Sequence, residues 1–318
     1  MNGAKWLALT GALAAALLLV GAVRRRVLGS AAGRRFLRHP AATPGVFVLA
    51  FFALLALAAP VVAPYDPAWM PGVVELQNRP PSALHPLGTD PYSRDVWSRL
   101  VYGARISLGI GALATLVAVT LGAAVGAFAG YCRRWVDAAL MRFVDVGLAL
   151  PRIFVLLMVV ALWEHVPLAV LVLVIGLTSW FPTSRLVRGE VLSLREREFV
   201  AAARALGAGT GRVIFRHVLP NAAAPIVVSA ALGIGNVMLL EAGLSFLGLG
   251  VPSPAPSWGS MIFDGSQQIA AAPWTSLFPG LAIALVVMAL NGVADGLRDA
   301  LDPRREGGSG GGGGGRAA

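Results

Sequence analysis

Long apolar runs restrict the fold of this chain more than any other feature of its sequence. Stretches close to the roughly 20 residues that a helix needs to cross a hydrocarbon core recur along the chain. The runs are continuous and do not alternate with a period of two, which favours helices over a β-barrel. Charged residues make up only 13% of the 318 residues, against about 25% in soluble domains. The sequence therefore predicts an all-α fold, a polytopic membrane helix bundle.

Six core transmembrane helices are expected from these runs. Pro151 is expected to kink the third one, because proline removes a helical hydrogen bond. The polar segments at 63–102 and 248–273 are expected to be turn-rich and to lie on the outer side. The second span carries glycines that allow close helix contacts, namely Gly109, Gly122, Gly126 and Gly130. The six spans are placed at about 44–62, 104–131, 144–163, 167–181, 223–247 and 274–293.

The apolar run at 6–23 predicts an extra helix ahead of the core. Arg24, Arg25 and Arg26 follow it directly, and no small-residue cleavage site precedes them. An anchoring helix, an uncleaved signal-like segment and a start codon placed too early remain alternatives. We expect three parts: a hydrophobic segment and basic linker at 1–33, a transmembrane domain at 34–305, and a disordered glycine-rich tail at 306–318.

The arginines predict the orientation of the chain in the membrane. The net charge is +10, and the basic residues lie mainly in short segments between apolar runs. By the positive-inside rule, the segments 24–43, 131–143 and 182–221 and the C-terminus face the cytoplasm. No run interleaves basic with aromatic residues as a nucleic-acid groove would, so we expect no nucleic-acid partner.

Catalytic apparatus is not visible in the sequence. Lys5 is the only lysine and has no phosphate-binding context, which excludes a Walker A ATPase. The histidines are scattered without zinc-ligand spacing, at His39, His85, His165 and His217. We therefore expect no catalytic residue, no metal and no cofactor of its own, and a protein that is not an enzyme.

The basic segment 182–221 carries the clearest functional pattern. A helix is predicted at 190–206, with Leu192, Phe199, Ala203 and Leu206 on one stripe, a smooth run Ala201–Ala203, and Gly207 at its end. A second short helix would carry Val213, Ile214 and Val218 until Pro220 stops it. Two short helices joined by a glycine hinge suggest a docking element for a partner. The alternative is an amphipathic helix lying on anionic lipid.

The same residues carry a family resemblance. EFVAAARALG at 198–207, continuing to HVLPN at 217–221, resembles the EAA loop of bacterial ABC-type permeases. Further motifs are similar to the dipeptide/oligopeptide/nickel branch of that family, and to the C-type permease of its heterodimer. These are HPLGTD at 85–90, SRD at 93–95, YGARISL at 102–108, EAGLSFLGLGVP at 241–252, SWG at 257–259 and LRDALDP at 297–303.

The resemblance implies a permease subunit of an ATP-driven importer in the bacterial inner membrane. It would move peptides or a related small solute by alternating access, with a sister permease, two cytoplasmic ATP-binding subunits that bind the ATP, and an extracytoplasmic solute-binding protein. The coupling residues would be Ala201, Ala202, Ala203, Arg204, Gly207, His217, Leu219 and Pro220. Ala201 replaces the usual glutamate of the motif and His217 the usual isoleucine. An ATPase-independent secondary transporter or channel is the alternative function.

Three isolated charges receive separate interpretations. Glu241 in a predicted span lines a translocation path, pairs structurally or reaches the outer interface by snorkelling. Asp145 is expected to pair with Arg142, three residues before it, and an ion relay is the alternative. Asp295, with Arg298 and Asp299, is expected to form a charge network at the end of the last helix. The stretch 85–95 either contacts the binding protein or the substrate entrance, or forms a packed extracellular turn.

Overall fold

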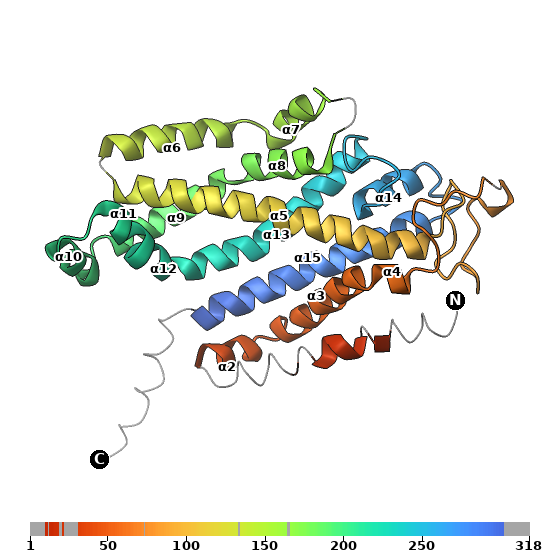
Figure 1. The fold of residues 1–318 in the computed structure, drawn as a ribbon, viewed down its shortest axis with the longest axis horizontal. Coiled ribbons are helices and arrows are strands. Elements are labelled where there is room, and N and C mark those ends of the chain that lie inside the picture. The colour runs from red at the N-terminus through yellow and green to blue at the C-terminus, as the bar shows by residue number, and fades with distance from the viewer. Residues whose placement is uncertain are drawn as a thin grey trace, which may run out of the picture.

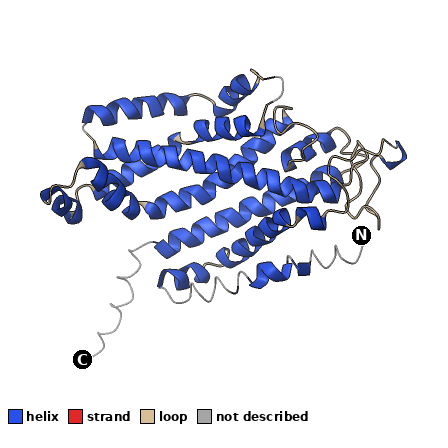
Figure 2. Cartoon of the chain, viewed as in Figure 1, coloured by secondary structure: helices blue, strands red, loops and turns tan. Residues whose placement is uncertain are grey.

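The computed structural model describes residues 10–11, 13–18, 21, 31–72, 74–132, 134–163 and 166–301. These residues form helices and loops and contain no β-strand (Figure 2), which confirms the all-α prediction. The described residues of the predicted extra helix at 6–23 are helical, and the rest of that prediction lies outside the described part. The predicted tail at 306–318 also lies outside it.

Three long helices and three bent pairs build the bundle (Figure 1). Each long helix is long and apolar enough to cross a membrane by itself. Each bent pair is long and apolar enough when its two helices are counted as one span. The described residues therefore hold up to six spans, as predicted. The long helices are α5 (Val96–Tyr131), α13 (Ala223–Phe246) and α15 (Trp274–Leu301). The pairs are α2 (Ala31–Arg38) with α3 (Ala42–Leu57), α6 (Arg134–Ala149) with α7 (Arg152–Val160), and α8 (Leu168–Ser179) with α9 (Phe181–Leu194).

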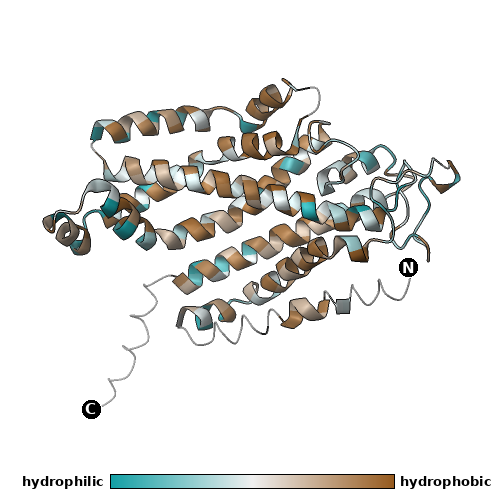
Figure 3. Cartoon of the chain, in the orientation of Figure 1, coloured by the Kyte–Doolittle hydropathy of each residue, from teal (hydrophilic) through white to brown (hydrophobic). Residues whose placement is uncertain are grey.

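The two ends of the bundle differ in composition, and hydrophilic residues gather toward both of them (Figure 3). One end, here called the arginine-rich end, carries α2, α10 (Glu198–Ala205), α11 (Thr210–Val213), a π-helical segment (Ile214–Val218) and α12 (Leu219–Asn221). The opposite end, here called the loop end, carries α4 (Ala59–Val62), a 3-10 turn (Val74–Leu76), the connection to α5, and α14 (Trp258–Ser266).

The packing of the loop-end half centres on Trp258 of α14. Its side chain is fully buried, and its indole N–H donates to the carbonyl oxygen of Leu100 at 2.9 Å. Its ring packs in a T-shaped arrangement with that of Phe52, with the ring centroids 5.3 Å apart. This core joins α3, α5, α13, α14 and α15, and a second core joins α5 to α7, α8 and α13. Helix α5 therefore belongs to both.

Paired charges are buried at the loop end. Arg94 contacts Asp90 and Asp264, each at 2.6 Å, and Arg99 contacts Asp264 at 3.2 Å. Asp95 caps α5 by accepting from the Ser98 backbone N–H at 2.8 Å. Since a buried charge is tolerated when it is paired and hydrogen-bonded, the stretch 85–95 folds as a packed turn, and its contact with the binding protein or the substrate entrance stays a prediction.

Several helix boundaries differ from those expected. Helix α5 begins at residue 96 rather than 104, α6 at 134 rather than 144, α9 continues to 194, and α15 continues to 301. The kink predicted at Pro151 is present as a bend of 82°, which divides the span into the two helices α6 and α7. The turn-rich segment 248–273 contains α14, which a capping box between Ser257 and Ser260 begins. Hydropathy locates the apolar middle of a span, whereas capping decides where its helix starts.

Helices α5 and α9 approach each other closely through glycine. A Cβ atom added at Gly122 would lie 2.8 Å from the carbonyl oxygen of Trp180, and one at Gly130 would lie 2.9 Å from that of Arg188. Gly126 is similarly blocked by the Ser184 carbonyl oxygen. The predicted glycine contacts are thus present at three positions, whereas a Cβ atom at Gly109 would meet nothing within 4 Å.

Substitution of Gly126 by alanine tests this packing. We expect Gly126→Ala to push α9 away from α5 and to destabilise the protein by about 1–3 kcal/mol, as overpacking does. The measurement is the midpoint of thermal unfolding of the purified protein in detergent. Gly109→Ala is the matched control and should leave the midpoint unchanged or raise it. Equal midpoints for the two variants would contradict the close contact.

Candidate functional site

Residues 198–221, here called the docking segment because the sequence predicts that a partner docks there, are packed onto the membrane bundle. Val200 and Ala203 of α10 are buried together with Val213, Ile214 and Val218. These side chains form one core with residues that lie on α5 and α9, namely Ala127, Val187 and Val191. Any displacement of α10 is therefore resisted by the ends of two spanning helices.

The outward side of α10 is small and apolar. Ala201, Ala202, Ala205 and Leu206 are exposed, and we call these residues the alanine face. Leu206 is 89% exposed, the highest value among the exposed large apolar side chains described. An apolar surface at the tip of a protruding helix is typical of a site that a partner covers.

Polar contacts hold α10 against the end of α5. The Arg204 Nε donates to the Tyr131 hydroxyl at 2.8 Å, and the guanidinium lies over the same ring at 4.8 Å. Arg195, just before α10, donates to the carbonyl oxygen of Gly130 at 3.1 Å. The predicted coupling residue Arg204 is therefore placed where it fixes the orientation of the alanine face.

Gly207 ends α10 in a Schellman motif. Its N–H donates to the carbonyl oxygen of Arg204 at 2.9 Å, and the next N–H, of Ala208, donates to that of Ala203 at 3.1 Å. The φ angle of Gly207 is +80°, a conformation that residues with a Cβ atom adopt at a cost. The predicted glycine hinge is thus a fixed turn that sets the angle between α10 and α11.

The sequence prediction needs correction in this segment. The single helix expected at 190–206 is two helices, separated at residues 195–197. Ala203 points into the core, while Phe199 and Leu206 are exposed, so the predicted stripe does not form one face. Pro220 does not stop the second helix, which continues to Asn221. A π-helical turn precedes Pro220. This turn is wider than an α-helical turn, so it leaves room for the proline ring and does not need the backbone N–H that proline lacks.

The remaining coupling residues lie behind the alanine face. His217 is half-buried in the π-helical segment, and its carbonyl oxygen accepts from the Asn221 side chain at 2.6 Å. Leu219 packs at the edge of the core, and Pro220 is exposed. The structure thus brings all the predicted coupling residues into one compact element, with Ala201 and Ala202 outermost.

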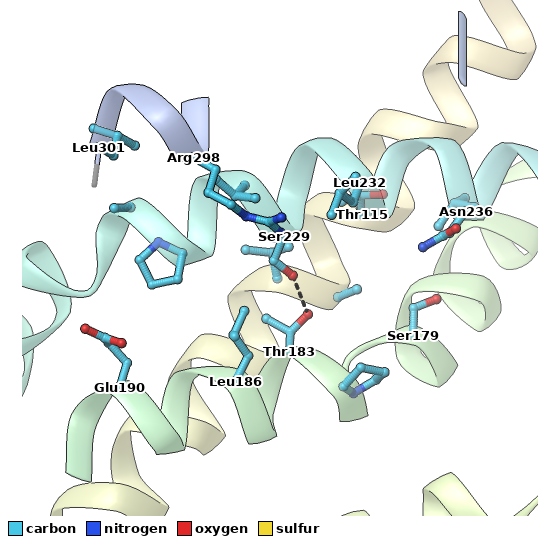
Figure 4. A pocket seen from close by; sticks show the side chains of 18 of the residues that line it. Thr115, Ser179, Thr183, Leu186, Glu190, Ser229, Leu232, Asn236, Arg298 and Leu301 are labelled. Carbon is cyan, nitrogen blue, oxygen red and sulfur yellow. Dashed lines mark hydrogen bonds between the residues drawn. The ribbon is translucent and has the colours of Figure 1, made fainter. Parts of the chain in front are cut away.

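A cavity of about 600 Å³, with both apolar and polar side chains in its wall, lies beside this element, between α5, α7, α8, α9, α13 and α15. Glu190 and Leu186 of α9 lie on one side of it, and Arg298 and Leu301 of α15 lie on another (Figure 4). Further in, uncharged polar side chains line the wall, and Thr183 and Ser229 approach each other at 3.4 Å. These uncharged side chains include Thr115, Ser179, Thr183, Ser229 and Asn236.

The cavity was not predicted from the sequence. Its lining comes from six helices spread over nearly 190 residues, between Thr115 and Leu301. Asn236 in the middle of a predicted apolar span was the available signal, since polar groups within spans are costly and often functional. The Thr115 hydroxyl oxygen is buried with no hydrogen-bond partner among the described residues.

Two of the three isolated charges are structural in this geometry. Glu241 is buried and accepts from the hydroxyls of Ser245 at 2.7 Å and Ser257 at 2.8 Å, so it joins α13 to the start of α14. This is the structural pairing that was one of its three alternatives. Asp145 forms its ion pair with Arg185 of α9 rather than with the expected Arg142.

The third charge, Asp295, lies 3.9 Å from Arg298. Both side chains are more than half exposed, so the pair adds little to stability. Asp295 and Arg298 thus form one weak contact of the expected charge network at the end of the last helix, and Arg298 is directed to the cavity (Figure 4).

The fold is that of a multi-pass helical membrane protein, with a cavity between its helices and a short helix with exposed apolar residues packed on one end. The chain belongs to the family of binding-protein-dependent transport system inner membrane components, whose family model matches residues 96–307. A second model, the N-terminal TM domain of oligopeptide transport permease C, matches residues 28–86.

Curated relatives span most of this chain. A dipeptide transport system permease protein, DppC, from Alkalihalophilus pseudofirmus is 44% identical over 268 residues, which cover 84% of this chain and 87% of that protein. A putative peptide permease protein from Brucella suis is 43% identical, with 86% and 90% covered. A glutathione transport system permease protein, GsiD, from Pectobacterium atrosepticum is 41% identical, with 85% and 89% covered.

Family membership fixes the general role. The chain is a multi-pass inner-membrane permease of an ABC importer, which works with ATPase subunits and a solute-binding protein. This favours the ATP-driven function over the secondary transporter or channel. The family is a class of transport permeases and not a class of enzymes.

Gly207 provides a test of the geometry of the docking segment. We expect Gly207→Val to strain the turn and lower solute uptake several-fold, because the left-handed conformation costs about 1–2 kcal/mol with a branched side chain. Gly207→Asn should retain most of the uptake, since asparagine tolerates this conformation. Uptake by whole cells at matched protein levels is the measurement.

Gly209→Val is the matched control, because Gly209 has a φ of −66° and no neighbour within 4 Å of an added Cβ atom. If Gly207→Val and Gly209→Val gave the same uptake, the fixed turn at Gly207 would have no role in coupling.

Proposed function

We propose that this chain is the C-type permease of a heterodimeric importer for peptides or closely related solutes, and that its alanine face docks onto one ATPase subunit. The printed functions of the relatives support a peptide-like solute, since they are dipeptide, peptide and glutathione permeases. The single observation that carries the docking proposal is the exposed alanine face on a helix packed into the bundle.

The arginine-rich end faces the cytoplasm in this proposal, and so does the C-terminus. Arginines of α2, α9, α10 and the following turns gather there, whereas the loop end balances its arginines with aspartates. This distribution agrees with the positive-inside rule. The loop end would then receive the solute from the extracytoplasmic binding protein.

The sister permease covers part of the membrane-embedded surface of this chain. In α5 and α13 only 33% and 22% of the most apolar window are buried within the chain. Lipid can cover such a surface. A transport path through the cavity, however, needs a second wall that keeps lipid out of it. A second permease subunit supplies that wall.

Helix α9 links the docking site to the cavity. Thr183, Leu186 and Glu190 on α9 line the cavity, and α9 leads directly into α10 through residues 195–197. Closure of the ATPase dimer would displace the alanine face, and α9 would move with it because α10 shares a core with α9 and α5. The cavity would widen or narrow accordingly, which is alternating access.

The chemistry of the cavity suits a peptide. Glu190 can attract an α-ammonium group, and Arg152 and Arg298 can attract an α-carboxylate. The uncharged polar groups deeper in the cavity offer donors and acceptors to peptide amides. The cavity offers few polar groups to a bound solute, so the solute could leave again, as transport requires.

A bulky residue on the alanine face tests the docking proposal. We expect Ala202→Trp to reduce co-purification of the ATPase subunits at least tenfold, because a close-packed interface cannot take the added volume. Ala202 is exposed, so the chain itself should fold normally. Pull-down of the ATPase subunits from detergent-solubilised membranes gives the measurement.

Ala83→Trp is the control, because Ala83 is exposed at the loop end. It should leave ATPase recovery unchanged. Wild-type recovery for Ala202→Trp would show that the ATPase docks elsewhere.

A further inference from the structure

A pocket of basic character lies at the arginine-rich end, away from both the alanine face and the cavity between the helices. It has a volume of about 330 Å³ and is lined by Arg35, Arg38, His39, Pro40 and Asp299, a set that we call the basic pocket. We propose that the basic pocket binds the phosphate headgroup of an anionic phospholipid. This inference does not depend on the transported solute or on the ATPase docking site.

The position of α2 places the basic pocket at the membrane surface. Helix α2 makes an angle of 88° with the spanning helix α3, so it runs across the bundle axis and along the plane of an interface. It is amphipathic: Arg34, Arg35 and Arg38 lie on one side of the helix, and Phe36 and Leu37 lie on the other. Such a helix lies at the boundary between headgroups and acyl chains.

Close packing holds α2 in this position. A Cβ atom added at Gly296 of α15 would approach the Phe36 ring to 3.0 Å, and one at Gly292 would lie 2.7 Å from the carbonyl oxygen of Ala41. The turn between α2 and α3 therefore rests directly on α15. The basic pocket forms where this turn meets Asp299, so its walls are preorganised.

The lining suits one phosphodiester. Arg35 and Arg38 carry two positive charges and Asp299 one negative charge, which leaves a net charge of +1 with His39 neutral. A diester headgroup such as that of phosphatidylglycerol carries one negative charge and matches this balance. Free phosphate carries between one and two negative charges at neutral pH, more than a diester, so the carboxylate of Asp299 disfavours it.

His39 supplies a second observation. Its Nδ1 atom is buried and has no hydrogen-bond partner among the described residues. A buried polar atom without a partner is costly, and His39 also lines the basic pocket in which a phosphate group would lie. Basic pockets beside spanning helices at the cytoplasmic surface are suited to anionic headgroups.

The test is lipid binding by the purified transporter, measured by native mass spectrometry after delipidation and addition of defined lipid. We expect phosphatidylglycerol to remain bound and phosphatidylcholine not to, and we expect phosphatidylglycerol to raise the thermal midpoint. Arg38→Gln should weaken phosphatidylglycerol binding roughly tenfold or more, as expected for loss of a charge-assisted contact. Arg38 is exposed, so its substitution should not unfold α2.

Arg142→Gln is the matched control, because it removes the same charge from an exposed position on α6 and should leave binding unchanged. His39→Ala should also weaken binding. Equal binding by Arg38→Gln and wild type, equal retention of phosphatidylcholine, or an equal stabilisation by inorganic phosphate alone would each overturn the proposal.

Discussion

The close approach of α5 and α9 is the interaction on which the rest of this structure depends. Glycines at 122, 126 and 130 remove the side chains that would hold the two helices apart. Carbonyl oxygens and β-branched side chains of α9 fill the space. Because spanning helices gain little from the hydrophobic effect within lipid, such close van der Waals contact is a main source of their association.

This contact gives α9 two roles at once. Its side facing the cavity carries Thr183, Leu186 and Glu190, and its end shares a core with α10 and the π-helical segment. Helix α9 thus contributes both to the cavity wall and to the core beneath α10, and the bond from Arg204 to Tyr131 ties α10 to the end of α5. The loop end is held separately, by Trp258 and by the buried pairs of Arg94 and Arg99.

The sequence predicted the parts of the fold that depend on hydropathy and local motifs. The span at 223–247 differs by one residue from α13, and the docking segment lies where its alanines and Gly207 indicated. Helix α14 was missed because its start depends on a Ser257–Ser260 capping box, a weaker signal than one with glutamate. The cavity was missed because Thr115, Asn236 and Arg298 come together only through long-range packing.

Double electron–electron resonance on the whole transporter tests most directly whether α9 and the tip move as one body. One pair of spin labels would join Ala202 on α10 to Thr120 on α5, and a second would join Leu186 to Leu301 across the cavity, with Cys132 replaced by serine. Trapping the ATPase subunits with nucleotide should shift the 186–301 distance and leave the 202–120 distance unchanged. A shift in 202–120 with a constant 186–301 distance would contradict the account.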